Sequence, residues 1–277
     1  MTEHCDLNHA PIGVFDSGVG GLTVAREIMR QIPNERIVYF GDTARVPYGS
    51  KSKDNIIKFS RQIIRFLQTE NVKAIVIACN TASALALDEM QQEFDLPILG
   101  VVKPGAKVAV ETTANKRIGL IGTEANIRSG VYTRYIKSLD DEAKVFEKAC
   151  PLFVPLVEEG WLHDDITLQV ASRYLEELKE KDIDTLIMGC THYPLIRSTI
   201  RKVMGDKVNL VNPAYETAIE LKNLLERDNL ANKCDVDSPS SMYRFYVSDA
   251  EEKFKLFANS ILPFDITMTK QINIENY

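Results

Sequence analysis

The 277-residue sequence has no long apolar run and no excess of positive charge. A helix that crosses a bilayer needs about 18 to 20 consecutive apolar residues, and no stretch approaches that length. The first residues are polar and lack the apolar segment of a secretory signal. The formal net charge of −6 does not provide the basic surface that nucleic acids require. We therefore expect a cytoplasmic protein that binds neither membranes nor nucleic acids.

Motifs for metals, disulfides and common cofactors are also missing. The five cysteines are far apart, with no C-x-x-C pair and no regular spacing to the four histidines. Neither a disulfide framework nor a zinc site is predicted from this pattern. The glycines of residues 18–21 do not have the G-x-G-x-x-G spacing of a dinucleotide site. No lysine lies in a context typical of a Schiff base, so we expect no metal and no cofactor.

Short β-branched segments alternate with longer amphipathic ones. In the first part of the chain the apolar segments are 12–15, 37–40, 74–78 and 98–102. Between them, apolar residues at three- and four-residue spacing predict helices over 22–32, 55–70 and 82–94. Such alternation indicates an α/β fold with a mainly parallel sheet flanked by helices.

The same pattern then repeats along the chain. Residues 118–123 (IGLIGT) are similar to 12–17 (IGVFDS), and 185–192 (TLIMGCTH) are similar to 74–81 (AIVIACNT). We therefore predict two similar α/β lobes related by pseudo-twofold symmetry, with the active site in the cleft between them. Proline or glycine follows an apolar strand at two points, which places the lobe boundaries. The predicted lobes are 1–102 with 213–277, and 103–212.

The final predicted elements come after the second boundary. A helix is expected over 215–226, a polar segment over 227–241, and a strand-helix unit over 243–260.

Two cysteines occupy matched positions in the repeat. Cys79 (ACNTAS) and Cys190 (GCTHYP) each lie between a strand end and a helix start. Ligands bind at the carboxyl ends of parallel strands, and a helix N-terminus is expected to lower the pKa of a thiol there. A lone cysteine after an apolar strand is usually a small buried side chain, which is our interpretation of Cys5, Cys150 and Cys234. Two cysteines in matched contexts instead indicate a catalytic role for Cys79 and Cys190.

Two further residues, Asp16 and His192, could exchange protons with these thiols. Asp16 ends the first strand, where it is either a proton partner or a helix cap. His192 stands two residues after Cys190, whereas His4, His9 and His163 are interpreted as ordinary histidines. Taken alone, Glu158 would be a solvated acid at a helix edge.

Taken together, the motifs FDSGVGG, PYG, CNTAS, EEG and GCTHYPL resemble the glutamate racemase family from about residue 12 to 218. The resemblance implies two aspartate/glutamate-racemase-like lobes, no pyridoxal phosphate, and a homodimer. It implies interconversion of L- and D-glutamate by two-cysteine proton transfer at Cα, which supplies D-glutamate for peptidoglycan. The sequence departs from the family at Asn212-Pro213, where Asp-Ser is the commoner pair.

The resemblance also assigns residues to roles. The implied catalytic residues are Cys79, Cys190, Asp16, His192 and Glu158. The residues implied to line the substrate site are Asp16, Ser17, Tyr48, Gly49, Asn80, Thr81, Thr123, Thr191 and His192.

The chemistry agrees with these roles, because racemisation needs a base on one face of a carbon and an acid on the other. Two alternatives stay open: an aspartate racemase or related two-cysteine isomerase, and a non-catalytic binding protein on the same fold. The histidine and the Tyr-Pro pair that follow Cys190-Thr191 favour glutamate as the substrate.

Overall fold

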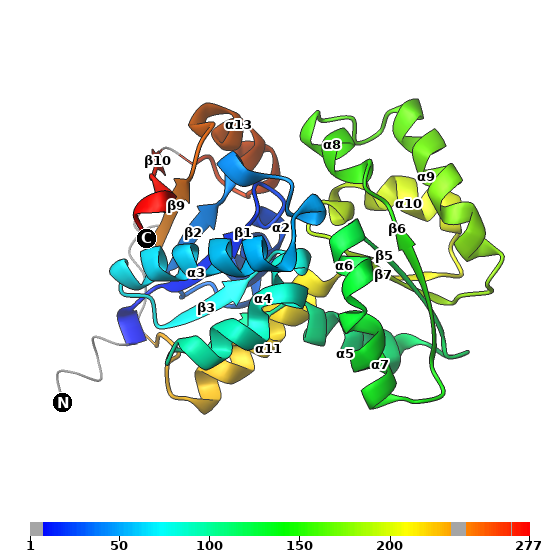
Figure 1. Ribbon diagram of the computed structural model, residues 1–277, viewed down its shortest axis with the longest axis horizontal. Coiled ribbons are helices and arrows are strands. Elements are labelled where there is room, and N and C mark those ends of the chain that lie inside the picture. The colour runs from blue at the N-terminus through cyan, green and yellow to red at the C-terminus, as the bar shows by residue number, and fades with distance from the viewer. Residues whose placement is uncertain (1–7, 234–241, 267) are drawn as a thin grey trace.

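The computed structural model describes residues 8–233, 242–266 and 268–277, and it shows two lobes lying side by side (Figure 1). His4, Cys5 and Cys234 lie outside the described residues. So do residues 234–241, the larger part of the polar segment predicted over 227–241. Among the described helices, none is long and apolar enough to cross a membrane.

The helices and strands alternate along the chain. The elements of the first sheet and its helices are β1 (Ile12–Asp16), α2 (Leu22–Gln31), β2 (Ile37–Gly41), α3 (Lys53–Thr69), β3 (Ala74–Ile77), α4 (Asn80–Glu93), β4 (Ile98–Gly100), α11 (Pro213–Arg227), β9 (Tyr243–Val247), α13 (Glu251–Ile261) and β10 (Thr269–Gln271). Those of the second are α5 (Val102–Thr112), β5 (Arg117–Gly122), α6 (Glu124–Ser129), α7 (Val131–Leu139), β6 (Lys144–Ala149), α8 (Phe153–Glu158), α9 (Asp165–Lys179), β7 (Thr185–Gly189), α10 (Arg197–Met204) and β8 (Asn209–Val211). Short 3-10 helices are η1 (Thr43–Arg45), η2 (Tyr48–Ser50), η3 (Tyr193–Ile196) and η4 (Ile274–Asn276).

Both sheets are parallel in their described pairings. The strand order is β10-β9-β2-β1-β3-β4 in the first sheet and β6-β5-β7-β8 in the second. The predicted fold class, two α/β lobes with mainly parallel sheets, is therefore confirmed. Strand β10 lies beyond the last predicted element and pairs with β9 at the edge of the first sheet.

Helices α3 and α4 each begin two residues earlier than predicted. Helix α3 begins at Lys53 rather than residue 55, because the Ser52 side chain caps it by accepting a hydrogen bond from the Asn55 N–H. Helix α4 begins at Asn80 rather than residue 82, with Cys79 as its N-cap. Asn80 therefore belongs to the first turn of the helix that follows the cysteine.

Each sheet is covered on both faces, because successive strand residues point to opposite sides. On β2, Val38 and Phe40 pack with α3 and α4, whereas Ile37 and Tyr39 pack with α2, α11 and α13. The second sheet is buried in the same way, between α9 and α10 on one face and α5 and α7 on the other. Burial of both faces explains the continuous apolar runs in the sequence.

The chain passes between the sheets twice, near α5 and α11, which pack against each other. Asn212 caps α11 by accepting a hydrogen bond from the Ala214 N–H at 3.1 Å, and Pro213 occupies the first turn. The Asn-Pro pair is thus a helix start. The predicted lobe boundaries fall near these two passages, and the assignment of each residue to a lobe stays a prediction.

A buried ion pair between Lys73 and Glu35 connects distant segments of the first lobe. Lys73 Nζ lies 2.5 Å from Glu35 Oε2, and it donates to the backbone carbonyls of Asn8 and Leu230 at 2.8 Å each. The Lys73 side chain is fully buried and that of Glu35 is 4% exposed. Burial lowers the pKa of Lys73, against the opposing effect of Glu35. Through these contacts Lys73 holds together four segments that are distant in the sequence, its own included.

Lys73→Met should destabilise the fold, because it leaves the Glu35 carboxylate buried without its cation. Loss of one partner of a buried pair typically costs about 3–5 kcal/mol. Lys53→Met, which breaks an exposed pair with Glu89, is the matched control and should cost no more than about 1 kcal/mol. Urea unfolding of both variants measures this, and equal losses of stability would contradict the structural role of Lys73.

Candidate active site

The two matched cysteines lie at corresponding places in the two lobes. Cys79 follows β3 and Cys190 follows β7, and each of these strands pairs with the first strand of its own sheet, β1 or β5. Cys79 is only 5% exposed and Cys190 only 6%. Both line one small cavity between the lobes. The repeat in the sequence therefore places two thiols around a single space.

Most of the predicted site residues surround this same cavity. They are Ser17, Tyr48, Gly49, Cys79, Asn80, Thr81, Thr123, Glu158, Cys190, Thr191 and His192. The cavity also has an apolar side that the sequence did not predict, made by Val46, Pro47 and Val154. Its volume of about 20 Å³ leaves room for roughly one water molecule. The site is therefore closed, and a ligand the size of an amino acid requires it to open.

A wider hollow adjoins the cavity on the side of η2 and α8. It has a volume of about 270 Å³ and shares Pro47, Gly49 and Glu158 with the cavity. Its walls come from the first lobe (residues 46–50) and from the second lobe around α8. Movement of either wall would open a path from this hollow to the thiols.

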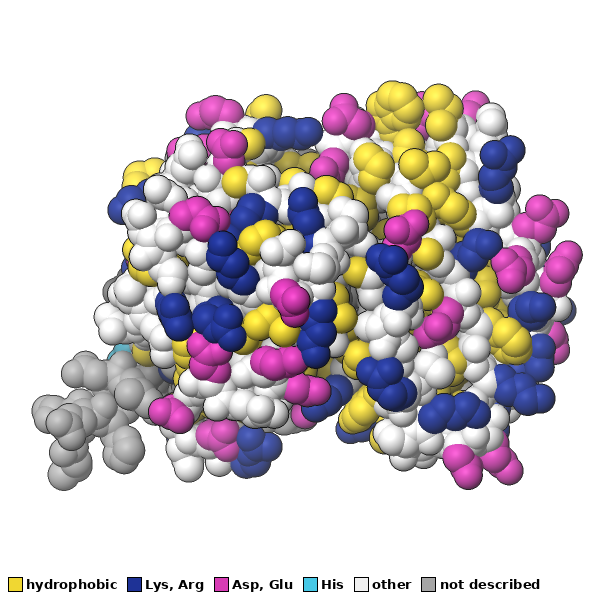
Figure 2. Space-filling model, in the orientation of Figure 1, with side chains coloured by type: hydrophobic (Ala, Val, Ile, Leu, Met, Phe, Trp, Pro, Cys, Tyr) yellow, Lys and Arg dark blue, Asp and Glu magenta, His cyan; other side chains and the backbone are white. Residues whose placement is uncertain are grey.

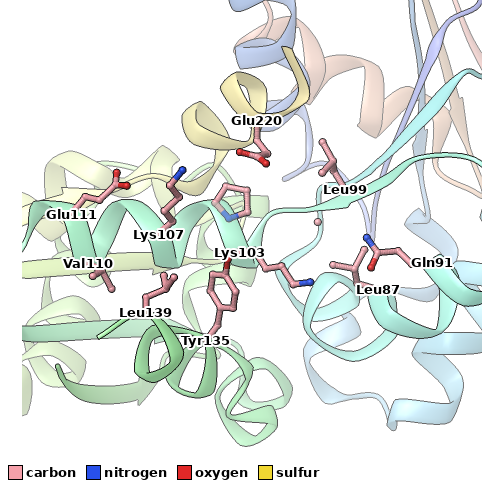
Figure 3. A pocket seen from close by; sticks show the side chains of 12 residues that line it. Leu87, Gln91, Leu99, Lys103, Lys107, Val110, Glu111, Tyr135, Leu139 and Glu220 are labelled. Carbon is pink, nitrogen blue, oxygen red and sulfur yellow. The ribbon is translucent and has the colours of Figure 1, made fainter. Parts of the chain in front are cut away.

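A third hollow, of about 510 Å³, lies between α4, α5, α7 and α11 (Figure 3). Its lining includes Lys103, Lys107 and Tyr135 but no cysteine or histidine. None of the predicted site residues borders it. The chemistry suggested by the thiols therefore belongs to the small cavity.

Asp16 is fully buried behind the cavity rather than lining it. One carboxylate oxygen accepts from the Gly18 N–H at 3.1 Å, and the other accepts from the Thr191 hydroxyl at 3.3 Å. Asp16 does not cap α2, whose N-cap is Gly21. Burial raises its pKa, although the charge of His192 and these hydrogen bonds oppose the rise. Asp16 thus links the end of β1 to the segment after Cys190 in the other lobe.

Burial has a larger effect on the pKa of the Cys79 thiol than the helix N-terminus has. Burial first and the negative charge of Asp16 second raise its pKa to about 12. Hydrogen bonds from the Ala82 N–H and the Ser17 side chain act in the opposite direction but are weaker. The Ala82 N–H at the helix start lowers the pKa of Cys79 as expected, but burial and Asp16 outweigh it, so the expected net lowering is wrong and Cys79 is a thiol at neutral pH.

Cys190, His192 and Glu158 form a row of proton-carrying groups. His192 Nδ1 lies 3.8 Å from the Cys190 sulfur, and His192 Nε2 lies 3.2 Å from Glu158 Oε1. Burial lowers the pKa of His192, but its contacts with Cys190 and Glu158 outweigh burial and raise it to about 10. The same hydrogen bond lowers the pKa of Glu158 despite its partial burial. Glu158 is therefore the carboxylate partner of an imidazolium, not a solvated acid.

Hydrogen bonds across the lobes hold the cavity closed. The hydroxyls of Thr81 and Thr123 lie 2.9 Å apart. The Thr23 hydroxyl shares its proton between the Gly20 carbonyl at 2.9 Å and the Thr191 carbonyl of the other lobe at 3.1 Å. The Tyr48 hydroxyl donates to Asp42 and so fixes the start of η2. Sequence reasoning missed Thr23, because its partner lies in the other lobe and no local pattern indicates the contact.

Comparison with known proteins places the chain in a family. The family model for Asp/Glu/hydantoin racemases matches residues 12–219. The chain is 44% identical to the glutamate racemase of Geobacter metallireducens over 264 residues, covering 95% of this chain and 97% of that one.

Solved structures of glutamate racemases have the same fold as this chain. The glutamate racemase isoform of Bacillus anthracis has a TM-score of 0.91 at 39% identity, covering 96% of this chain and 98% of that one. The Francisella tularensis glutamate racemase, solved with D-glutamate, has a TM-score of 0.90 at 38% identity, covering 98% and 100%. Because relatives more than 40% identical match it over nearly its full length and solved structures share its fold, the chain belongs to the glutamate racemase family.

Proposed function

We propose that this chain interconverts L- and D-glutamate by direct proton transfer at the α-carbon, with Cys79 and Cys190 as the two proton-transfer groups. The observation that carries the proposal is that thiols from corresponding strand ends of the two lobes line one closed cavity. One sulfur, as thiolate, takes the α-proton. The other, as thiol, gives its proton to the opposite face, so that the configuration inverts and no group is oxidised or reduced.

Charge builds on the substrate's α-carboxylate as the proton leaves, and the site offers donors to offset it. Asn80 and Thr81 form the first turn of α4, where backbone N–H groups are unpaired within the helix. Thr191 and Ser17 add hydroxyls from the other walls. Exclusion of water from the small cavity strengthens each of these interactions.

The resting protonation states favour one starting direction. Cys79 is a thiol at neutral pH, which equips it to donate a proton. His192 is an imidazolium at 3.8 Å from Cys190 and attracts negative charge on that sulfur. This arrangement suits Cys190 as the base toward L-glutamate and Cys79 as the acid. D-Glutamate, for which the roles exchange, then requires Cys79 to lose its proton.

The proposal includes no metal and no cofactor, because the two thiols supply both the acid and the base. The reaction would supply D-glutamate for peptidoglycan, and we place the protein in the cytoplasm as a homodimer.

Hydrophobic side chains gather near α8 and α9 (Figure 2), where Leu152, Trp161 and Ile166 are about half exposed. That surface is a candidate for the contact between two copies.

Cys79→Ser and Cys190→Ser should each lose racemisation in both directions by about 100- to 10,000-fold, because a hydroxyl is a far weaker base than a thiolate. Cys150→Ala is the matched control, since Cys150 is buried in the second lobe outside the cavity. Circular dichroism with each enantiomer of glutamate and aspartate measures the activity. Full activity in either serine variant would refute the two-thiol mechanism, and faster turnover of aspartate would refute the substrate.

Glu158→Gln should lower the pKa of His192 from about 10, because it removes the carboxylate that helps to hold the proton. A group whose folded pKa exceeds its unfolded value of 6.5 stabilises the fold fully below pH 6.5, and this is lost as pH rises through about 10. The variant should therefore be least stable relative to the parent near pH 6 and equally stable above pH 10. NMR titration of His192 and unfolding at both pH values test this. An unchanged His192 titration would show that Glu158 does not hold the proton.

His192→Asn and Asp16→Asn should affect the two directions differently. His192 contacts Cys190, so its loss should lower kcat more for L-glutamate. Asp16 is the carboxylate that acts on Cys79 and is able to accept the proton that Cys79 must lose, so its loss should lower kcat more for D-glutamate. Enantiomers have an equilibrium constant of one, so kcat/KM must fall equally in both directions, and the asymmetry appears in kcat and KM separately. Equal changes of the two kcat values in either variant would disprove the division of roles.

A further inference from the structure

A buried tyrosine of the second lobe contacts the residue that follows Cys79 in the first. Tyr132 lies on α7, is 1% exposed, and donates a hydrogen bond from its hydroxyl to Asn80 Oδ1 at 2.7 Å. Asn80 lines the cavity, whereas Tyr132 does not. The bond therefore supports the cavity wall from behind and crosses between the lobes.

This bond determines which end of the Asn80 amide faces the cavity. A buried hydroxyl needs an acceptor for its proton, and Asn80 Oδ1 is the acceptor that the described residues provide for Tyr132. If the amide were reversed, two donor groups would compete and the tyrosine proton would lose its partner. With Oδ1 occupied, Asn80 presents its N–H₂ group, which is a donor only. A donor at this place in the wall suits a carboxylate.

The Tyr132 hydroxyl packs close to the Gly105 position of α5. A methyl group added at Gly105 on α5 would lie 2.8 Å from Pro213 Cγ and 3.3 Å from the Tyr132 hydroxyl oxygen. Gly105 and Pro213 belong to the helices near which the chain passes between its two sheets. The Tyr132 hydroxyl therefore lies close to the place where the two lobes join.

We propose that Tyr132 is a positioning residue that holds the Asn80 amide as a hydrogen-bond donor into the cavity, so that Asn80 binds a substrate carboxylate when the lobes are closed. This inference rests on the proposed function, because it assumes that Asn80 contacts the substrate. It adds a residue outside the cavity to the binding of the amino acid, and it makes that binding depend on contact between the lobes.

Tyr132→Phe removes only the hydroxyl and should raise KM for both enantiomers by about 5- to 20-fold, with kcat little changed. The size corresponds to the loss of one buried hydrogen bond, and the KM effect reflects weaker binding throughout the reaction. Tyr246→Phe is the matched control: it also removes a tyrosine hydroxyl bonded to a side chain, Glu70, but away from the cavity. Thermal unfolding of both variants checks that each is folded. An unchanged KM in folded Tyr132→Phe would overturn the inference.

Two further variants separate this inference from the proposed function. In an Asn80→Ala background, adding Tyr132→Phe should raise KM no further, because the amide it positions is gone. Independent, multiplying effects would overturn the positioning role. Asn80→Asp keeps an acceptor for Tyr132 but offers no N–H, so its KM should exceed that of Asn80→Ala, and a lower KM would contradict the donor role.

If Asn80→Ala leaves KM unchanged, the inference fails, yet loss of racemisation in Cys79→Ser and Cys190→Ser still supports the proposed function. If the cysteine variants stay active while Asn80→Ala and Tyr132→Phe raise KM together, the two-thiol proposal fails and the positioning role stands.

Discussion

Parallel pairing of the strands is the constraint on which the rest of this structure depends. Because all described strands of a sheet run in one direction, their carboxyl ends meet along one edge, and the segments after β1, β3, β5 and β7 contribute to one cavity. Each lobe contributes one cysteine from such an end to the cavity. A reaction that works on two faces of a carbon needs two groups that face each other, and two similar lobes in contact provide this geometry without any group having to move around the substrate.

Neighbouring charged groups then set the chemistry of the two thiols apart, although both are buried and their sequence contexts match. Cys79 is surrounded by low-dielectric packing and by the charge of Asp16, which together keep its proton in place. Cys190 instead has a protonated imidazole beside it, held by Glu158. A symmetric reaction is therefore carried out by an asymmetric pair, with different neighbours compensating for the charge in each half. The cavity of about 20 Å³ is smaller than an amino acid, so its walls must move apart to admit the ligand.

Sequence reasoning predicted the features that depend on local pattern. Apolar runs ending in turn residues gave the strands, and the repeat of Cys79 and Cys190 gave two lobes with one site. Features that depend on distant contacts were not predictable. The Thr23 and Tyr132 hydroxyls bind partners in the opposite lobe, and the raised pKa of Cys79 follows from the depth of burial, which a helix-start motif does not report. Helix starts shifted where Ser52 and Asn212 cap their helices, because capping depends on backbone geometry that composition alone leaves open.

The central claim is that Cys79 and Cys190 stand on opposite faces of the substrate's α-carbon. A crystal structure of the protein with D-glutamate bound tests it most directly, through the two distances from the α-carbon to the sulfur atoms and the angle between them. The account predicts one D-glutamate in the small cavity, with both sulfurs at roughly 3.5 Å from the α-carbon and on opposite sides of it. A ligand bound with both sulfurs on one side, or with only one of them within reach, would contradict it.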